Sequence, residues 1–411
     1  MSLAEIFGHV AGGRPVRFVG YDGSRSGPED APATVELKSP LALRYLASAR
    51  GELGLARAYV TGHLDITGDL YEALRALLGG EKPEISWAER AEVLRTLGIG
   101  VLSPMPRPPE EAPPPRQRGR RHSKARDAAA ISHHYDVSNA FYEMILGPSM
   151  AYTCAVFEKP GDTLEQAQAE KFDLVCRKLG LRPGMRLLDV GCGWGGMVMH
   201  AVEHYGVRAL GVTLSKQQAD WAAEAIGERG LGERAEVRFL DYRAVTETGF
   251  DAVSSIGLTE HIGEANLGSY FTFLASKLTP GGRLLNHCIT RPNGLEGSRT
   301  GSFIDRYVFP DGELVGPGTI VSQMHDHGLE VRHLENLREH YAMTLAAWGA
   351  NLERNWPDVV AEAGLGRARV WRLYLAASRV NFELDRIELH QVLGVRTGPD
   401  GESGVGLRPS W

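Results

Sequence analysis

The stretch Arg186–Gly196, RLLDVGCGWGG, decides the fold of this chain. An apolar run ends at Asp189 and leads into three alternating glycines, Gly191, Gly193 and Gly195. Glycine permits a sharp turn between a strand and a helix, and it lets a ligand lie directly against the backbone. The stretch therefore predicts a nucleotide-type binding site at the end of a strand.

Two cofactor classes fit such a loop. With Gly196 it also satisfies the G-x-G-x-x-G pattern of dinucleotide sites, which need an acid about 20 residues further on for the ribose. The next expected strand, Arg208–Thr213, is followed by Leu214 and Ser215, so the acid that a dinucleotide site needs is absent from its end. The acid of this loop precedes the glycines, at Asp189, where it suits a cationic ligand better than a pyrophosphate. S-adenosylmethionine, with its ammonium and sulfonium groups, is therefore favoured over NAD.

Composition excludes several classes of protein. The 411 residues are 43% hydrophobic and 23% charged, which is typical of a soluble protein with two domains. A net charge of −6 gives no case for nucleic-acid binding. The four cysteines form no C-x-x-C pair, so we expect neither a metal site nor a disulfide framework. Free cysteines are typical of a reducing compartment, so we expect a cytoplasmic location. We expect no signal peptide and no membrane-spanning segment.

The composition changes at one place and predicts three regions. Residues 103–127 are rich in proline and then in arginine, which predicts an extended linker. Its basic half is either simply solvated or attracted to anionic lipid headgroups. Residues 1–102 are expected to form a small α+β domain for substrate docking or dimerisation, and residues 128–411 a methyltransferase domain.

The first domain is expected to mix short strands and helices. The expected strands are Val16–Tyr21 and Thr34–Lys38, and the expected helices are Pro40–Ala49, Leu53–Val60 and Leu70–Leu78. Asp69 is placed to cap the last helix, because Asp is a preferred residue before a first helical turn. Few of its residues are typical of catalysis.

After the linker, expected strands and helices alternate, which indicates a doubly wound parallel α/β sheet with helices on both faces. Helices are expected after the glycine turn, at Ser215–Gly227 and at Asn266–Leu278. Seven strands with a late last one fit the class I methyltransferase sheet. The expected strands are Arg186–Val190, Ala209–Thr213, Glu236–Leu240, Ala252–Ile256, Arg283–Ile289, Leu329–Leu334 and Ile387–Leu393.

Ligands of such sheets bind beyond the carboxyl ends of the strands, which selects the candidate cofactor residues. The glycine loop is expected to hold the methionine part of the cofactor, and the ends of the next two strands its ribose and adenine. Ser215 is equally a candidate N-cap of the following helix. The candidates are Asp189, Gly191, Cys192, Gly193, Trp194 and Gly195 in the loop, Thr213, Leu214, Ser215 and Gln218 after the second strand, and Asp241 and Tyr242 after the third.

A second set of candidates could carry chemistry. Glu260 and His261 directly follow the fourth strand, at the point where the strand order reverses, so a functional role is favoured for Glu260. His287 lies in the apolar run LLNHCIT and is equally a core or a functional residue on these grounds. For Cys154 and Tyr341, packing is the simpler interpretation.

With these residues described, the chain resembles the cyclopropane-fatty-acid synthase family of S-adenosylmethionine-dependent methyltransferases. The motifs that carry the resemblance are HHYDVSNAFYEMILGPSMAYTCAVF (His133–Phe157), LLDVGCGWGGM, GVTLSKQQ, LDYR, SIGLTEHIG and HYAMTLAAW. The resemblance covers about residues 130–395 strongly. The N-terminal region resembles more loosely the small domain of phospholipid-acting bacterial members, which mycolic-acid-modifying members generally lack.

The resemblance implies a reaction and its residues. In the family, a cis double bond of a lipid acyl chain attacks the methyl group on the sulfonium, and a bound bicarbonate takes the proton that the carbocation loses. The matching positions are Cys154, Glu260, His287 and Tyr341, all four expected to be catalytic and to bind bicarbonate, together with the backbone at Ile289. We also assign Tyr152 and Thr153 to the cofactor site. A buried anion needs such polar partners.

The chain departs from the family pattern at three positions. Ser378 stands where the family often has a cysteine, which excludes a thiol nucleophile there. Thr259 replaces a common aromatic residue and Thr290 a frequent glycine. Either change could alter which proton is lost, so the product is a cyclopropane ring or a methylene branch. The methylene chain is the precursor of a 10-methyl branch, which a separate reductase would complete.

The sequence thus predicts a homodimeric enzyme at the inner face of the cytoplasmic membrane that modifies unsaturated, oleoyl-like phospholipid chains. Two rivals stay open: a soluble methyltransferase acting on O or N of small molecules, and a non-catalytic lipid-binding or scaffolding protein.

Overall fold

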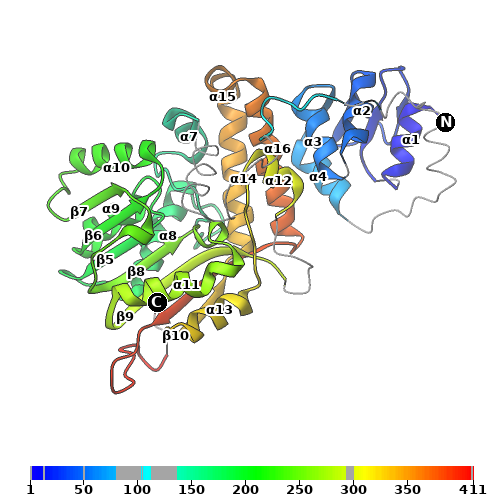
Figure 1. The fold of residues 1–411 in the computed structure, drawn as a ribbon. Helices are drawn as coiled ribbons and strands as arrows, with labels where there is room; N and C mark the ends of the chain where they lie inside the picture. Colours follow the sequence, from blue (N-terminus) through cyan, green and yellow to red (C-terminus); the bar gives the residue numbers. More distant parts are fainter. Residues whose placement is uncertain are drawn as a thin grey trace. The chain divides into compact units, whose positions relative to one another are not determined.

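The computed structural model describes residues 2–12, 14–49, 51–79, 103, 105–112, 137–292, 300–408 and 411 (Figure 1). The chain divides into two compact units. The first unit comprises Met1–Arg116, Gly301–Pro310 and Trp356–Leu384, and the second comprises Gln117–Thr300, Asp311–Asn355 and Asp385–Trp411. The expected boundaries at 102/103 and 127/128, and the basic half of the expected linker, lie outside the described residues.

The first unit contains a four-stranded sheet in the order β2-β1-β3-β4. Alternate residues of β3 are buried, which gives this strand one face toward the helices. Asp69 caps α4 as expected, because its Oδ1 accepts hydrogen bonds from the backbone of Tyr71 and Glu72. The elements are α1 Leu3–Val10, β1 Arg17–Val19, β2 Arg25–Ser26, β3 Ala33–Leu37, α2 Pro40–Ser48, α3 Glu52–Val60, β4 Leu64–Gly68 and α4 Leu70–Leu78; α1, β2 and β4 were not expected.

Helices from late in the chain complete this unit: α12 (Ser302–Tyr307), α15 (Trp356–Ala363) and α16 (Leu365–Glu383). The guanidinium of Arg369 donates to the carbonyl of Tyr59 and to Asp65, each at 2.8 Å. The expected single domain over residues 128–411 therefore needs correction, because these contacts bind part of the late sequence to the N-terminal helices and sheet.

The first half of the expected linker is packed against the first unit at Glu111. Its carboxylate is fully buried and accepts two hydrogen bonds from Arg57, Nε at 2.6 Å and Nη2 at 2.8 Å, and two longer ones from Arg306. Burial by itself raises the pKa of Glu111, but the Arg57 hydrogen bond and charge outweigh it, and the pKa lies below its usual value. Residues 105–112 form neither helix nor strand, as expected, but they are not simply solvated.

The second unit is built on a seven-stranded sheet in the order β10-β11-β9-β8-β5-β6-β7, which confirms the expected α/β class. The expectation of an all-parallel sheet needs one correction: β11 runs antiparallel to both of its neighbours. The strands are β5 Arg186–Val190, β6 Arg208–Thr213, β7 Ala235–Phe239, β8 Phe250–Ile256, β9 Leu278–Thr290, β10 Glu330–Asn336 and β11 Glu388–Val395.

Helices cover both faces of this sheet (Figure 1). Alternate residues of β5 enter opposite cores: Leu187 packs with residues of α8 and α9, whereas Leu188 packs with residues of α11 and α13. A strand buried on both faces must be apolar almost throughout, which explains the run RLLDV. The helices are α7 Asn139–Leu146, α8 Leu164–Leu179, α9 Gly196–Tyr205, α10 Lys216–Glu228, α11 Leu267–Lys277, α13 Pro317–Asp326 and α14 Arg338–Arg354. None of the helices in the described ranges combines the length and the apolar character that a membrane crossing requires.

Replacing Glu111 tests the role of its buried ion pair. Glu111→Gln leaves two arginines without their carboxylate, and breaking such a pair costs about 3 kcal/mol. We expect the melting temperature of the first unit to fall by ~6–12 °C in calorimetry. The carboxylate stabilises only while ionised, so the difference from wild type should shrink as the pH falls below ~4. Glu110→Gln, at the adjacent half-buried position, is the control and should shift the transition little. An equal shift in both variants would contradict this assignment.

Candidate active site

The glycine loop lies at the carboxyl end of β5 and lines two adjoining hollows. Gly191 has φ 72° and Gly193 φ 54°, a left-handed backbone that favours glycine. The backbone N–H groups of Gly191 and Cys192 both donate to the carbonyl of Val212 on β6, at 2.9 and 3.0 Å. A Cβ at Gly191 would lie 3.2 Å from the side chain of Leu258. The loop is thus held in a tight turn that leaves bare peptide facing the hollows.

A buried acid and a buried base line the first hollow, which contains Asp189, Lys171 and Thr153. The hydroxyl of Ser254 donates to Asp189 at 2.6 Å, and the Nζ of Lys171 donates to the hydroxyl of Thr153 at 2.9 Å. Burial raises the pKa of Asp189 and lowers that of Lys171, while the charge of each opposes the shift of the other. The hollow therefore offers a carboxylate to a cationic ligand and keeps its own cation beside that carboxylate.

The second hollow is lined by Thr213, Leu214, Gln218 and Tyr242 beside the glycines. Thr213 donates to the amide oxygen of Gln218 at 2.7 Å. Ser215 caps α10, which was one of the two roles expected for it. Its hydroxyl accepts a hydrogen bond from the backbone N–H of Gln218 at 3.3 Å. These side chains are placed to bind a ribose and a base.

The structure does not bring every expected cofactor residue into the described lining. Gly195 is the N-cap of α9 and Ser215 that of α10, and neither is among the residues that line the two hollows. Asp241 makes a two-point ion pair with Arg243, Nε to Oδ1 at 2.8 Å and Nη2 to Oδ2 at 2.7 Å. Its carboxylate therefore has a partner within the protein, where we expected it to accept an adenine amino group. Tyr152, Cys192 and Trp194 do line the first hollow.

Glu260 lies where β8 stops and β9 continues. The last bond between these strands joins the N–H of Gly257 to the carbonyl of His287, at 2.8 Å. The next free amide of β9, at Ile289, donates to Oε1 of Glu260 at 2.7 Å. The other carboxyl oxygen, Oε2, is buried and has no hydrogen-bond partner among the described residues. Burial raises the pKa of Glu260 to about 7, against the effect of the Ile289 bond.

His287 is fully buried on β9 and points one nitrogen at a protein partner. Its Nδ1 lies 3.2 Å from Nε2 of Gln391, the residue opposite it on β11. Its Nε2 is buried and finds no partner in the part of the chain that the structure describes. Burial lowers the pKa of His287 well below its usual value, and the charges of Lys171 and Lys178 lower it further, so the ring is neutral.

Cys154 and Tyr341 meet at the start of α14. The Sγ of Cys154 lies 3.8 Å from the carbonyl of Leu337, and the N–H of Tyr341 donates to the same carbonyl at 3.1 Å. Burial raises the pKa of the Cys154 thiol strongly, so it stays protonated and is no nucleophile. Of the five expected bicarbonate positions, the structure directly pairs Glu260 with Ile289 and links Cys154 to Tyr341 through Leu337.

An aromatic chain connects Tyr341 to the first hollow. The ring of Trp348 lies 6.1 Å from that of Tyr341 and 5.4 Å from that of Tyr152, which lines the hollow. Trp348 is fully buried. Aromatic faces can stabilise a nearby positive charge. Sequence reasoning quoted the motif of Trp348 but gave this residue no role.

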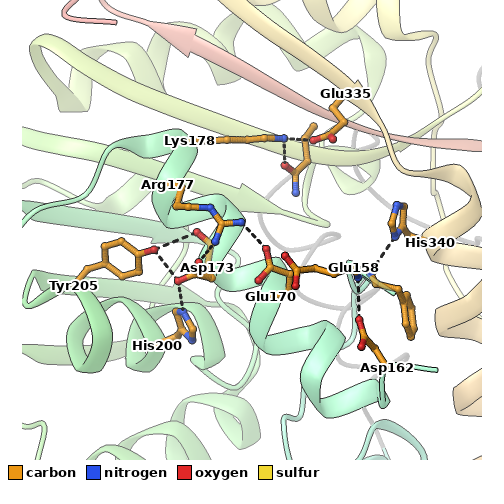
Figure 2. A network of polar contacts seen from close by, with 12 residues as sticks. Glu158, Asp162, Glu170, Asp173, Arg177, Lys178, His200, Tyr205, Glu335 and His340 are labelled. Carbon is orange, nitrogen blue, oxygen red and sulfur yellow. Dashed lines mark hydrogen bonds and ion pairs between the residues drawn. The ribbon is translucent and has the colours of Figure 1, made fainter. Parts of the chain in front are cut away.

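A polar network holds α8 in place (Figure 2). Arg177 forms ion pairs with Asp173 and Glu170, and the hydroxyl of Tyr205 donates to Asp173 at 2.7 Å. Further along the helix, Lys178 pairs with Glu335 of β10 (Figure 2). This network fixes the helix that presents Lys171 to the hollow.

The two unusual threonines have partners within the protein. The hydroxyl of Thr259 donates to Asn286 at 2.7 Å, and that of Thr290 lies 2.7 Å from Nδ1 of His390. These contacts occupy both hydroxyls. Ser378 lies on α16, in the first unit.

This sheet order, with a glycine loop at the end of β5, defines a class I S-adenosylmethionine-dependent methyltransferase. A family model described as mycolic acid cyclopropane synthetase matches residues 122–392. The chain belongs to this family.

Relatives support this membership over the whole chain. A probable fatty acid methyltransferase of Mycobacterium tuberculosis is 53% identical over 423 residues, covering 100% of this chain and 98% of the relative. The cyclopropane-fatty-acyl-phospholipid synthase of Escherichia coli is 31% identical over 375 residues and is covered to 90%, as is this chain.

A solved structure resembles the catalytic part. A mycolic acid cyclopropane synthase in complex with SAH and CTAB superposes with a TM-score of 0.62 at 32% identity. The match covers 65% of this chain and 97% of that structure.

Lys171 was not expected in the site, and replacing it tests its role. Lys171→Met keeps the apolar stem but removes the charge beside Asp189 and the donor to Thr153. Asp189 then holds its proton to higher pH and attracts a cationic ligand less. We expect the Kd for S-adenosylhomocysteine to rise about tenfold in calorimetric titration, equivalent to ~1.4 kcal/mol.

Lys159→Met, at an exposed loop position, is the control and should leave the Kd unchanged. A folded Lys171→Met protein with wild-type affinity would contradict the assignment.

Proposed function

We propose that this enzyme transfers the methyl group of S-adenosylmethionine to the cis double bond of an unsaturated phospholipid acyl chain. The product is a cyclopropane ring or a methylene branch that precedes a 10-methyl chain. Similarity over at least 90% of the chain to proteins named for fatty acyl and phospholipid substrates supports a phospholipid. The mycolic acid synthase matches only 65% of the chain, mainly the catalytic part.

The observation that carries the proposal is a pair of buried polar atoms, Oε2 of Glu260 and Nε2 of His287, that have no partner within the described part of the chain. Glu260 lies in the turn that follows β8, and His287 lies on the neighbouring strand β9, opposite Ile256. An unpaired buried polar group costs about 1–3 kcal/mol, so a ligand that pairs both is strongly favoured. Glu260 supplies an acceptor, and a neutral imidazole can supply a donor.

Bicarbonate fits this pair in chemical type. It carries an O–H that can donate to Glu260 and negative oxygens that can accept from His287. The N–H of Ile289, which we expected to contact bicarbonate, already donates to Glu260 and so acts by fixing that carboxyl group. The backbone N–H of Tyr341 and the thiol of Cys154 both lie against the carbonyl of Leu337, and the protonated thiol contributes packing and a weak donor.

These groups suit the two demands of the reaction. When bound, S-adenosylmethionine supplies an electrophilic methyl group, and the alkylated chain must then lose a proton, which bicarbonate accepts. Asp189 holds the cationic cofactor, the Tyr152–Trp348–Tyr341 rings face the positive charge, and Glu260 with His287 holds the anion. No protein side chain needs to act as the final base.

The location and partners are part of the same proposal. The enzyme binds the inner surface of the cytoplasmic membrane, where the arginines of residues 116–126 would attract anionic headgroups. The proposal also includes a homodimer that forms through the first unit. If the product is a methylene chain, a separate reductase converts it to the methyl branch.

Lipid analysis tests the proposed activity. Purified protein is incubated with oleoyl phospholipid vesicles and methyl-labelled S-adenosylmethionine. We expect labelled acyl chains one CH2 heavier, and NMR then distinguishes ring protons from an exocyclic methylene. Absence of labelled lipid would overturn the proposal, and methylation of a small molecule without vesicles would favour the rival O- or N-methyltransferase.

The polar cluster makes a sharper prediction. Glu260→Gln removes the carboxylate but keeps the shape, so we expect kcat to fall at least ~100-fold, the lower end of proton-transfer effects. Affinity for S-adenosylhomocysteine should not change, because Glu260 lies outside the lining of the first hollow. In bicarbonate-depleted buffer, wild-type turnover should fall and recover on adding bicarbonate.

Glu264→Gln, at an exposed position of the next turn, is the matched control and should keep wild-type turnover. Full activity of Glu260→Gln, or turnover indifferent to bicarbonate, would contradict the proposed cluster.

A further inference from the structure

A hydrogen-bonded chain leads from the edge of the sheet to His287. Lys178 of α8 donates to Glu335 of β10, whose side chain is 38% exposed. The same Nζ donates to Oε1 of Gln391 at 2.6 Å, and Nε2 of Gln391 lies 3.2 Å from Nδ1 of His287. Lys178, Gln391 and His287 are themselves fully buried. Figure 2 shows Lys178 between Glu335 and the adjoining amide side chain.

The chemistry of these groups fixes the direction of each bond. An ammonium group can only donate, so it must face the oxygen of Gln391. The NH2 of that amide then faces His287, and an amide NH2 also only donates. Nδ1 of His287 must therefore accept, which leaves the ring proton of the neutral imidazole on Nε2.

We propose that Lys178 and Gln391 are positioning residues that hold His287 as the Nε2–H tautomer. His287 then offers a hydrogen-bond donor, and no lone pair, at the buried atom that has no partner among the described residues. This assignment rests on the proposed function, in which an anion is bound there. The positioning role also explains why Lys178 of α8 is buried.

The other tautomer is opposed by the same contacts. A proton on Nδ1 would face the NH2 of Gln391, and turning the amide over would bring its NH2 against the ammonium of Lys178. Burial lowers the pKa of Lys178, and the hydrogen bond and charge of Glu335 oppose that shift. Both alternatives leave a buried donor facing a donor, which is unfavourable.

Nitrogen NMR tests the tautomer directly, on folded protein without lipid. The protein is labelled with ring-15N histidine, and the His287 signals are identified by their loss in His287→Gln. We expect a protonated Nε2 and an unprotonated Nδ1 in wild type. A protonated Nδ1 would overturn the inference.

Variants test which residues set it. Gln391→Glu replaces the donor NH2 by a carboxylate oxygen, so the ring proton should appear on Nδ1 and kcat should fall at least tenfold. Affinity for S-adenosylhomocysteine should stay unchanged. Glu335→Asp keeps a carboxylate beside Lys178 and should keep the Nε2–H signal. A Gln391→Glu protein with the wild-type tautomer would also overturn the inference.

The two proposals fail separately. If no labelled lipid forms but the Nε2–H signal is present, the proposed lipid reaction is wrong and the positioning role of Lys178 and Gln391 stands. Labelled lipid with an Nδ1–H signal would keep the reaction and remove that role.

Discussion

The candidate active site depends on the unequal lengths of two neighbouring strands. β8 ends at Ile256, while β9 continues to Thr290 because β11 pairs with it on its other side. The amide of Ile289 therefore has no strand partner on the β8 side, and the carboxyl group of Glu260 takes it. A buried amide must find an acceptor, so this termination holds a carboxyl group inside the protein with one oxygen left over.

Burial then sets the charge of each group at this edge. The same loss of water raises the pKa of Asp189 and Glu260 and lowers that of Lys171 and His287. Lys171 and the Ser254 hydroxyl oppose the shift at Asp189, which favours the anion that a cationic cofactor needs. His287 has two cations nearby and stays neutral. Two regions of the same edge thus differ in charge, one suited to a sulfonium and one to an anion.

Sequence reasoning predicted all seven strands of the sheet in the second unit, but it missed β2 and β4 of the first unit. It also selected Glu260 and His287, since strand ends in this fold meet at one edge. It did not foresee that Asp241 pairs with Arg243, which is only two residues further on in LDYR. The expected contact of Asp241 with adenine stays a prediction. The grouping of α12, α15 and α16 with the first unit was beyond reach, because sequence order does not encode which late helix packs on an early sheet.

Sequence reasoning gave the lysines of α8 no role. A lysine in an amphipathic helix is normally solvated, yet Lys171 and Lys178 are both fully buried. They are seven residues apart, which places them on one face of the helix, toward the sheet. Two ammonium groups on that face would be a severe cost unless each met a specific acceptor. Lys171 meets Thr153 and the field of Asp189, and Lys178 meets Gln391 and Glu335. One helix thus serves the cofactor hollow and the imidazole, so a shift of α8 would disturb both together.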